Sequence, residues 1–331
     1  MTILVTGGAG FIGSNVVRGL VKRGESVRVL DDFSSGKLSN LNDVMASVEI
    51  VEGDVRDAET CEKVCRGVDG ISHQAALSSV PGSIDEPITY HDVNVTGTLN
   101  LLRAARDQGT QRFVLASSAS VYGDAVDVVK TEDLTLCPLS PYACTKLTAE
   151  AYALAFKATC GLNTVALRYF NVFGPFQDPD STYAAVVPNF AARLMSSTPP
   201  TIFGDGEQVR DFTFIEDVVA ANLLALTCDE SACGEAYNVA CGSCYSVNEL
   251  FTVMRDCIGG GAAHIEPLRQ PTRKGDVRSS MASIDKARSV LGYSPQVEFG
   301  DGIRRTVDWY LQNLIAPGGT AVRDERESAF D

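Results

Sequence analysis

Tyr142 and Lys146 lie four residues apart at the start of a segment expected to be helical, Pro141–Cys160. On an α-helix, this spacing places both side chains on one face. A tyrosine phenol has a pKa of about 10 and is a poor base at neutral pH, but a neighbouring ammonium group lowers that pKa. The pair could therefore remove a proton from a hydroxyl group of a ligand. Taken alone, a Tyr and a Lys at this spacing are more often structural than catalytic.

A serine-rich segment supplies a second group for such chemistry. The apolar run Phe113–Ser117 is typical of a buried strand, and Ser118 follows it directly. In an open parallel sheet, ligands bind at the carboxyl ends of the strands. We therefore expect Ser118 to donate a hydrogen bond to a ligand oxygen while Tyr142 takes the proton. By itself, a serine-rich strand end would more often be an ordinary turn.

A glycine-rich segment, Thr6–Gly13, lies between an apolar run and an amphipathic run near the start of the chain. Strand, glycine turn and helix form the context in which such a pattern indicates dinucleotide binding. Gly7 permits the tight turn, Gly10 permits close approach of a pyrophosphate, and Gly13 permits close packing of the helix on the sheet. The N–H groups and the positive dipole end of that helix then face the anion.

Two carboxylates, Asp31 and Asp32, follow the second apolar strand, eighteen residues after Gly13. A carboxylate at this point accepts hydrogen bonds from the ribose hydroxyls of adenosine and repels a 2′-phosphate. A turn at the end of a strand would also explain an aspartate, but the glycine pattern favours the cofactor. The sequence therefore predicts an NAD site, and a bound nicotinamide cation would further lower the pKa of Tyr142.

Short apolar strands alternate with helical segments in the first half of the chain, which is typical of a parallel sheet covered on both faces. The expected strands are Thr2–Thr6, Ser26–Leu30, Val48–Glu52, Gly70–His73, Phe113–Ser117 and Thr164–Arg168, with Glu235–Val239 rejoining the sheet. The expected helices are Phe11–Arg23, Ala58–Arg66, Ile88–Gln108, Pro141–Cys160, Ala185–Met195 and Gly302–Leu314, with another that begins at the capping box Ser246–Glu249. Right-handed crossovers make this a doubly wound α/β fold.

Composition narrows the class of protein. The 331 residues are 45% hydrophobic, and no apolar run is long enough to span a membrane. The strand expected at Thr2 leaves no room for a signal peptide. A net charge of −14 has the wrong sign for a nucleic-acid surface. Ten cysteines are scattered, and the CxxC spacing of Cys241–Cys244 lacks a second pair or nearby histidines, so we expect a turn there and no metal site. These features indicate a cytoplasmic protein with reduced thiols.

Further motifs extend the pattern along the chain. They are Gly53–Val55 (GDV), His73–Ala76 (HQAA), Asn94–Thr98 (NVTGT) and Arg168–Gly174 (RYFNVFG). With the glycine segment, the serine strand and the Tyr–Lys pair, they make residues Thr2 to about Leu314 resemble the extended short-chain dehydrogenase/reductases, in particular the UDP-sugar 4-epimerase family. The resemblance implies a Rossmann-type sheet with a smaller C-terminal substrate-binding α/β domain. It also implies a homodimer formed through the Ile88–Gln108 and Pro141–Cys160 helices.

The resemblance implies a role for individual residues. Ser118, Tyr142 and Lys146 match the catalytic trio of the family. The cofactor-binding residues that it implies are Gly7, Gly10, Phe11, Ile12, Gly13, Asp31, Asp32, Asp54, Val55, Gln74, Ala75, Ala76, Leu77, Asn94 and Phe170, with Tyr142 and Lys146. The substrate-binding residues are Ser78, Ser79, Asn171, Ala185, Val186, Val187, Arg210, Arg273, Asp276 and Ser280, with Ser118 and Tyr142. Arginine suits a diphosphate because its planar guanidinium donates in a fork.

The two residues after Ser118 bear on the choice of reaction. Dehydratases and decarboxylases of the superfamily resemble one another in carrying an acidic residue there, because lyase chemistry needs another acid or base. Here the residues are Ala119 and Ser120. We therefore expect an epimerase, in which the C4 hydroxyl is oxidised, the 4-keto sugar turns about its diphosphate, and the hydride returns to the other face. Binding strength then belongs on the UDP, which does not react.

Ser280 bears on the choice of substrate. It aligns with a position where epimerases restricted to plain hexoses carry a tyrosine, and a serine leaves room for a 2-N-acetyl group. We expect interconversion of UDP-GlcNAc and UDP-GalNAc, with UDP-Glc and UDP-Gal as a second pair. The alternatives are an epimerase of UDP-Glc and UDP-Gal only, a nucleotide-sugar dehydratase or decarboxylase, and a non-catalytic NAD-sensing regulator on the same fold. Such regulators tend to lose the active Tyr or Lys.

The composition changes after Arg168, where residues 171–211 become rich in Gly, Pro and Asp. We expect residues 1–168 and about 212–240 to form the NAD-binding domain. Residues 169–211 and about 241–315 would then bind the UDP-sugar. The charged tail, 316–331, has little apolar surface to bury and is expected to be disordered.

Overall fold

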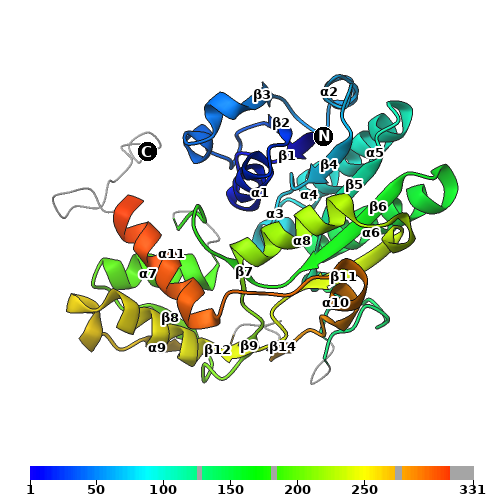
Figure 1. Cartoon of the computed structure of the whole chain (residues 1–331). Coiled ribbons are helices and arrows are strands. Elements are labelled where there is room, and N and C mark those ends of the chain that lie inside the picture. Colours follow the sequence, from blue (N-terminus) through cyan, green and yellow to red (C-terminus); the bar gives the residue numbers. More distant parts are fainter. Residues whose placement is uncertain (125–128, 180–184, 273–277, 314–331) are drawn as a thin grey trace.

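The computed structural model describes residues 1–124, 129–179, 185–272 and 278–313. Its central feature is a seven-stranded parallel sheet of order β11-β6-β5-β4-β1-β2-β3 (Figure 1). The strands are β1 Thr2–Thr6, β2 Ser26–Asp31, β3 Val48–Glu52, β4 Gly70–His73, β5 Arg112–Ser118, β6 Asn163–Tyr169 and β11 Glu235–Val239. The strand order reverses between β1 and β4, and ligands of such sheets bind outside the carboxyl ends at that point. The predicted Rossmann-type fold is confirmed, including the return of β11 to the sheet.

Helices cover both faces of this sheet. They are α1 Phe11–Lys22, α2 Ala58–Val64, α3 Val80–Asp85, α4 Pro87–His91, α5 Gly97–Asp107, α6 Pro141–Cys160 and α8 Ile215–Thr227. On one face α1 packs against α8, and on the other α5 packs between α2 and α6. Alternation along β1 explains the two layers, because Ile3 and Val5 enter one hydrophobic cluster and Leu4 enters the other.

The helix expected at Ile88–Gln108 is interrupted. After α4, residues Asp92–Thr96 form a π-helical turn, and α5 begins at Gly97. This turn places Asn94 inward, where its Nδ2 donates to the Leu77 carbonyl and to Thr145 Oγ1, each at 3.0 Å. Single π-turns within helices are frequent at functional sites. Here the turn ties the loop after β4 to helix α6.

Smaller elements form the C-terminal part. They are β7 Val172–Phe173, α7 Val186–Met195, β8 Thr201–Phe203, β9 Val209–Arg210, β10 Thr213–Phe214, β12 Tyr245–Ser246, α9 Val247–Ile258, β13 Leu268–Gln270, β14 Ser279–Ser280, α10 Asp285–Leu291 and α11 Phe299–Asn313. Short 3₁₀ helices are η1 Leu38–Leu41, η2 Met45–Ser47, η4 Ala119–Tyr122, η5 Glu230–Ala232 and η6 Gly260–His264. The predicted capping box of α9 is present. Helix α11 begins three residues before the expected Gly302, at Phe299, whose ring stacks on Tyr245 with centroids 4.0 Å apart.

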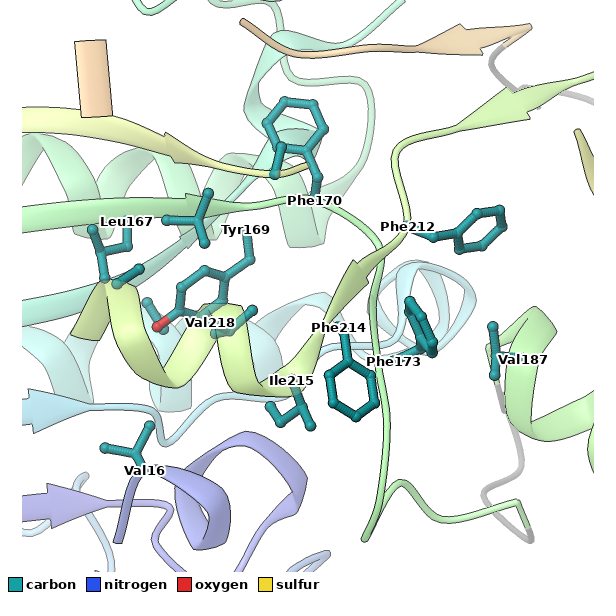
Figure 2. Close-up of a cluster of buried hydrophobic side chains, with 14 of the residues drawn as sticks. Val16, Leu167, Tyr169, Phe170, Phe173, Val187, Phe212, Phe214, Ile215 and Val218 are labelled. Atoms are coloured by element: carbon teal, nitrogen blue, oxygen red, sulfur yellow. The ribbon is translucent and has the colours of Figure 1, made fainter. Parts of the chain in front are cut away.

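One hydrophobic cluster joins the two parts of the molecule. Figure 2 shows Val16 of α1 and Leu167 of β6 on the sheet side, with Phe173, Phe214 and Val187 beyond them. The Phe173 and Phe214 rings meet edge to face, with centroids 5.6 Å apart. Because this core is continuous, the C-terminal elements are held firmly against the carboxyl ends of the strands. Within the described helices, none combines the length and the apolar character needed to cross a membrane.

Candidate active site

The three predicted catalytic side chains come from two packed elements. Ser118 ends β5, and Tyr142 and Lys146 lie on the first turns of α6, which packs against β5. The side chain of Ser140 caps α6 by accepting from the Ala143 N–H at 3.1 Å, with proline at the first helical position. This cap fixes where the helix begins and therefore where its first turns point. The Ser118 side chain lies close enough to Tyr142 to influence the ionisation of its phenol.

The protonation of this trio differs from the expectation. Burial raises the pKa of Tyr142, and the hydrogen bond with Ser118 lowers it by less. Lys146 is buried, which lowers its pKa to about 8, and its Nζ donates to the Ala116 carbonyl at 2.8 Å. The expected lowering of the Tyr142 pKa by Lys146 is therefore wrong for the protein alone, because enclosure disfavours the phenolate. Ionisation of this phenol requires further positive charge near it.

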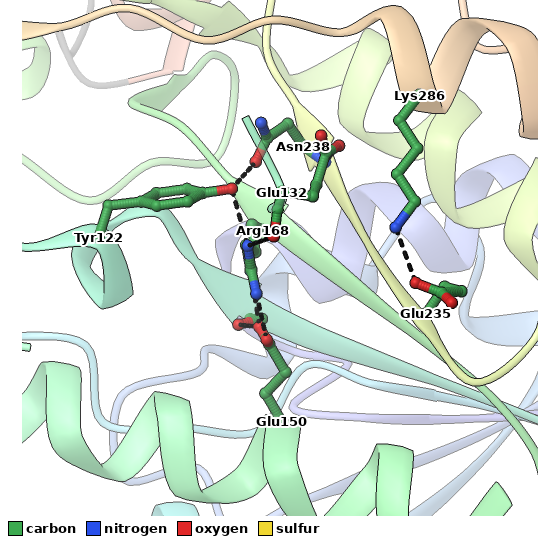
Figure 3. A network of polar contacts seen from close by, with 8 residues as sticks. Tyr122, Glu132, Glu150, Arg168, Glu235, Asn238 and Lys286 are labelled. Carbon is green, nitrogen blue, oxygen red and sulfur yellow. Dashed lines mark hydrogen bonds and ion pairs between the residues drawn. The ribbon is translucent and has the colours of Figure 1, made fainter. Parts of the chain in front are cut away.

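A buried polar network lies one helical turn beyond Lys146 (Figure 3). Glu150 of α6 forms an ion pair with Arg168 of β6, at 2.6 and 3.0 Å, and accepts from Ser117 Oγ at 2.6 Å. Arg168 also donates to the Tyr122 hydroxyl at 2.8 Å, and Tyr122 donates to Asn238 Oδ1 of β11 at 2.7 Å. The network joins three strands and helix α6 directly beneath the site. Of its members, Glu150 and Asn238 belonged to no motif singled out in the sequence.

The glycine segment fits a bound dinucleotide. Gly7 has a φ of +63°, and a Cβ on it would lie 2.7 Å from the Ala75 Cα. A Cβ on Gly13 would lie 2.0 Å from the Gly7 carbonyl oxygen, so helix and turn approach too closely for a side chain. Gly10 is the N-cap of α1 and brings no capping side chain. The first N–H groups of α1 thus remain available to a pyrophosphate.

The carboxylates expected around the adenosine are held in place by neighbouring groups. Asp31 is buried, and it accepts from the Ala9 N–H at 2.8 Å and the Phe33 N–H at 2.9 Å. Burial raises the pKa of Asp31. Asp32 is exposed and bonds to Ser34, while Asp54 pairs with Arg56 and Val55 is buried. Asp31 therefore shapes the glycine segment itself, and its remaining lone pairs could accept from a ribose.

The loop after β4 is held by an amide that sequence reasoning missed. Asn222 of α8 accepts from Gln74 Nε2 at 2.9 Å and from Ser72 Oγ at 3.1 Å, and donates to the Tyr169 hydroxyl at 2.8 Å. Tyr169 in turn donates to Gln74 Oε1 at 3.2 Å. An amide on the buried face of an otherwise apolar helix was the available signal. Gln74, Ala75, Ala76 and Leu77 are half-buried along this loop.

A second missed chain of hydrogen bonds passes through His73. The Thr98 hydroxyl donates to the Asn94 carbonyl at 2.6 Å, so it must accept from His73 Nε2 at 2.9 Å. The other ring nitrogen, Nδ1, then accepts from Thr6 Oγ1 at 2.6 Å. This assignment makes the imidazole neutral, and burial, reinforced by the charge of Lys146, lowers the pKa of His73 to about 3. The end of β1 is thereby tied to the π-helical turn.

Two predicted substrate residues that are seventy positions apart lie side by side. Ser280 of β14 pairs with Arg210 of β9 in parallel register. The Ser280 carbonyl also accepts from the Asp211 N–H at 3.0 Å. Asn171 is exposed, and its carbonyl accepts from the Thr213 N–H at 3.0 Å. Arg273 and Asp276 lie outside the described residues.

Three residues predicted at the site have side chains that serve the fold. Val187 and Phe170 are buried in the core, so a ligand could reach only their backbone (Figure 2). Ser79 uses its hydroxyl to cap α3, accepting from the Gly82 N–H at 3.0 Å. The other residues implied at the site keep some exposure; they are Phe11, Ile12, Ser78, Ala185 and Val186.

The CxxC pair, Cys241 and Cys244, forms no bond between its thiols. Cys241 Sγ donates to the Phe212 carbonyl at 3.3 Å, and the buried Asp211 carboxylate accepts from the Cys241 and Gly242 N–H groups. The pair thus belongs to an anchored turn. In the part of the chain that the structure describes, no group of three or more His, Cys, Asp or Glu side chains is placed to hold a metal.

Comparison with known proteins identifies the family. A model of the NAD dependent epimerase/dehydratase family matches residues 3–240. The protein belongs to this family. The putative UDP-glucose 4-epimerase of Methanocaldococcus jannaschii is 38% identical over 315 residues, which are 94% of this chain and 99% of that protein.

Solved structures agree with this epimerase family. A UDP-N-acetylglucosamine 4-epimerase from Methanobrevibacter ruminantium, in complex with UDP-N-acetylmuramic acid, superposes with a TM-score of 0.89 at 37% identity, covering 94% of this chain and 98% of that one. The UDP-glucose 4-epimerase of Thermus thermophilus, in complex with NAD, gives 0.85 at 37% identity over 95% and 100%. The predicted family, its isomerase class and its NAD cofactor are confirmed.

The family name covers both epimerases and dehydratases, so the residues after Ser118 carry added weight. Ala119 and Ser120 begin the 3₁₀ helix η4, and the Ser120 N–H donates to Ser118 Oγ at 3.1 Å. The buried Ser120 Oγ has no hydrogen-bond partner among the described residues. A buried hydroxyl without a protein partner is suited to hydrogen-bond with an oxygen of a ligand. This epimerase-family site thus offers a neutral hydroxyl where a lyase needs an acid or a base.

Proposed function

We propose that the protein is a UDP-sugar 4-epimerase that retains NAD through its cycle. UDP-GlcNAc and UDP-GalNAc are its preferred pair, and UDP-Glc and UDP-Gal are a second pair. One observation carries the reaction type: Ser118, Tyr142 and Lys146 are brought together with Ala119 and Ser120 beside them. Relatives named as UDP-glucose and UDP-N-acetylglucosamine 4-epimerases support the substrate class.

The chain's own residues can manage the proton at C4 of the sugar. Bound NAD supplies a hydride acceptor and afterwards a hydride donor. Tyr142, which lies near Ser118, takes the proton of the C4 hydroxyl and later returns it. Lys146 has a pKa of about 8 and is mostly cationic at pH 7, and its bond to the Ala116 carbonyl fixes its position. Its charge, joined by that of the oxidised cofactor, favours the phenolate.

The neighbouring residues favour re-reduction over elimination. Loss of water from a 4-keto sugar needs an acid for the leaving hydroxyl and a base for the adjacent carbon. Ala119 supplies neither, and the Ser120 hydroxyl is neutral at any physiological pH. The 4-keto sugar therefore does not lose water and persists until it turns its other face to the cofactor and is reduced. Residues 1–168 and about 212–240 would hold NAD during this turn, and residues 169–211 and about 241–315 would hold the UDP-sugar.

Product chromatography tests this function. Incubated with UDP-GlcNAc and, separately, with UDP-Glc, the protein should convert each to a mixture with its C4 epimer without added NAD. Omission of substrate and heat inactivation of the protein serve as controls. A 4-keto-6-deoxy sugar nucleotide as the product would overturn the epimerase proposal, and conversion of UDP-Glc alone would leave the reaction standing but refute the preferred pair.

Ser280 is proposed to leave room for the 2-N-acetyl group. Ser280→Tyr should lower kcat/KM for UDP-GlcNAc by about 10-fold or more relative to UDP-Glc, since steric discrimination in a pocket amounts to about 1–3 kcal/mol. Ser279→Tyr is the matched control, because neighbouring residues of a strand point to opposite faces. Kinetics of both variants on both substrates measure the effect. Equal losses on the two substrates would refute this role of Ser280.

An exposed apolar surface supports the proposed homodimer. Ile84 of α3 and Ile88 of α4 are 64% and 76% exposed, and Tyr152 of α6 is 38% exposed. Helices α3 and α4 both pack against α6, so these side chains lie on neighbouring elements. Large apolar side chains gathered on one surface mark association sites. We propose that a second copy of the chain covers them.

A further inference from the structure

Two thiols and a guanidinium lie close together at the amino end of β5, the end opposite to Ser118. Arg112 is the first residue of β5, whereas Ser118 is the last. Arg112 Nη1 donates to Cys228 Sγ at 3.0 Å and also to Cys233 Sγ, and Nη2 donates to the Cys228 carbonyl at 2.7 Å. Cys228 directly follows α8, and Cys233 lies between η5 and β11. The Cys228 thiol donates to the Ala225 carbonyl at 3.3 Å, and the Cys233 thiol donates to the Asp229 carbonyl at 3.7 Å.

The charges around this cluster favour a thiolate. Besides Arg112, Lys157 at the end of α6 acts on Cys233, and its own partners are Glu230 and Asn163, each at 2.7 Å. Among the described residues, Arg112 and Lys157 are thus two cations near the thiols, and the Tyr237 hydroxyl donates its proton to the Ala232 carbonyl. The neighbouring Cys233 and the Arg112 guanidinium lower the pKa of Cys228. Low-pKa, partly exposed cysteines in cationic surroundings are the reactive ones.

We propose that Cys228 and Cys233 are a peroxide-reactive pair that closes to an intramolecular disulfide. Cys228 is half-buried and attacks, whereas Cys233 is buried and resolves. The Cys228 thiolate takes one oxygen of hydrogen peroxide, so the O–O bond breaks, a sulfenic acid forms, and the other oxygen leaves as water after protonation. The Cys233 thiol then displaces that hydroxyl as a second water. Two thiols are oxidised by two electrons, and one hydrogen peroxide is reduced to two waters.

Another cysteine pair serves as a control within the same chain. Cys61 and Cys65 lie four residues apart on α2 and are fully buried. Burial raises the pKa of each of these thiols to about 12. Two thiols are close together in both pairs, and Cys228–Cys233 differs because Cys228 is partly exposed and both thiols accept hydrogen bonds from a guanidinium.

Peptide mapping of the peroxide-treated protein tests the pair. The full chain is exposed to hydrogen peroxide, its free thiols are alkylated, and it is cleaved after glutamate. Cleavage after Glu230 separates residues 217–230 from 231–235 unless a disulfide joins them, and places Cys241 and Cys244 in another peptide. We expect the joined peptides, two hydrogens lighter than their sum and separated by reduction, with Cys61 and Cys65 unoxidised. Recovery of Cys228 and Cys233 as separate alkylated peptides would overturn the proposal.

Variants isolate the role of the cation. Arg112→Gln should slow alkylation of Cys228 at pH 7 by about five- to tenfold, since fewer thiols are ionised. Cys233→Ser should keep wild-type epimerase turnover and leave a sulfenic acid at Cys228 that a 1,3-dione traps. Alkylation of Arg112→Gln at the wild-type rate would refute the role of the guanidinium. If Arg112→Gln does not fold, the alkylation rates of Cys228 and Cys61 are compared in the wild-type protein. Cys228 should react faster, and equal rates would overturn the proposal.

Discussion

Replacing Tyr142 with phenylalanine should lower kcat by about 10²- to 10⁴-fold, the range of general acid–base catalysis. The substitution removes the only oxygen of the side chain, so the proton of the C4 hydroxyl has no acceptor at this position. The KM for the UDP-sugar should change little, because binding strength lies on the UDP and not on the reacting carbon. Turnover is measured by product chromatography, and NAD content is measured after denaturation to confirm that the cofactor site is intact.

Tyr90→Phe is the matched control for that variant. Tyr90 of α4 is buried and close enough to Tyr142 to influence its ionisation, so the substitution removes a neighbouring phenol hydroxyl only. We expect it to retain turnover within a few-fold of wild type. If Tyr142→Phe were as active as wild type, the catalytic assignment would fail, and the alternative of a non-catalytic NAD-sensing regulator would gain support.

The second large effect concerns stability. Arg168→Met should lower the free energy of unfolding by about 3–5 kcal/mol, because it leaves the Glu150 carboxylate charged and unpaired in the interior. Glu150 is 2% exposed and Arg168 is 4% exposed, so water cannot replace the lost partner. The double variant Arg168→Met/Glu150→Met should be more stable than the single one, because it buries no unpaired charge. Urea unfolding of both variants measures the difference.

Arg304→Met provides the surface control. Arg304 pairs with Asp301 at 2.7 Å, with both side chains more than half exposed, and pairs of this kind contribute about 0–1 kcal/mol.

The double variant Arg168→Met/Glu150→Met keeps a defect of its own, since Ser117 loses the acceptor Glu150 and Tyr122 loses the donor Arg168. A double variant no more stable than Arg168→Met would show that the buried charge is not the source of the loss.

The fold was predictable because its determinants are local. Apolar runs and glycine turns marked the main strands, and the return of Glu235–Val239 to the sheet followed from its composition. The Asp92–Thr96 π-turn was missed because its apolar spacing matches that of an uninterrupted helix. The two-residue strands β9 and β14 were also missed, since pairing of Arg210 with Ser280 depends on the tertiary structure and not on a pattern.

The residues of the site also fall into those that local motifs predict and those that depend on tertiary contacts. Motifs placed Ser118, Tyr142 and Lys146, whereas the contacts that support them join distant segments. Glu150 could have been suspected, because it lies four residues after Lys146 on the same face of α6. Its partner, Arg168 on the adjacent strand β6, could not be predicted, because no sequence pattern indicates which arginine pairs with Glu150. The direction of the Tyr142 pKa shift was wrong because spacing reveals a neighbouring charge but not the enclosure that opposes it.

Deuterium at C4 of the substrate tests most directly whether this chain performs epimerisation with a retained hydride store. C4-deuterated UDP-GlcNAc is incubated with the purified protein and without added NAD, and the product is analysed by mass spectrometry and NMR. We expect UDP-GalNAc with its deuterium still at C4 and a constant amount of bound NAD over many turnovers. Deuterium at C6 of a 4-keto-6-deoxy sugar, or its loss from the sugar together with consumption of added NAD in step with turnover, would contradict the proposed function.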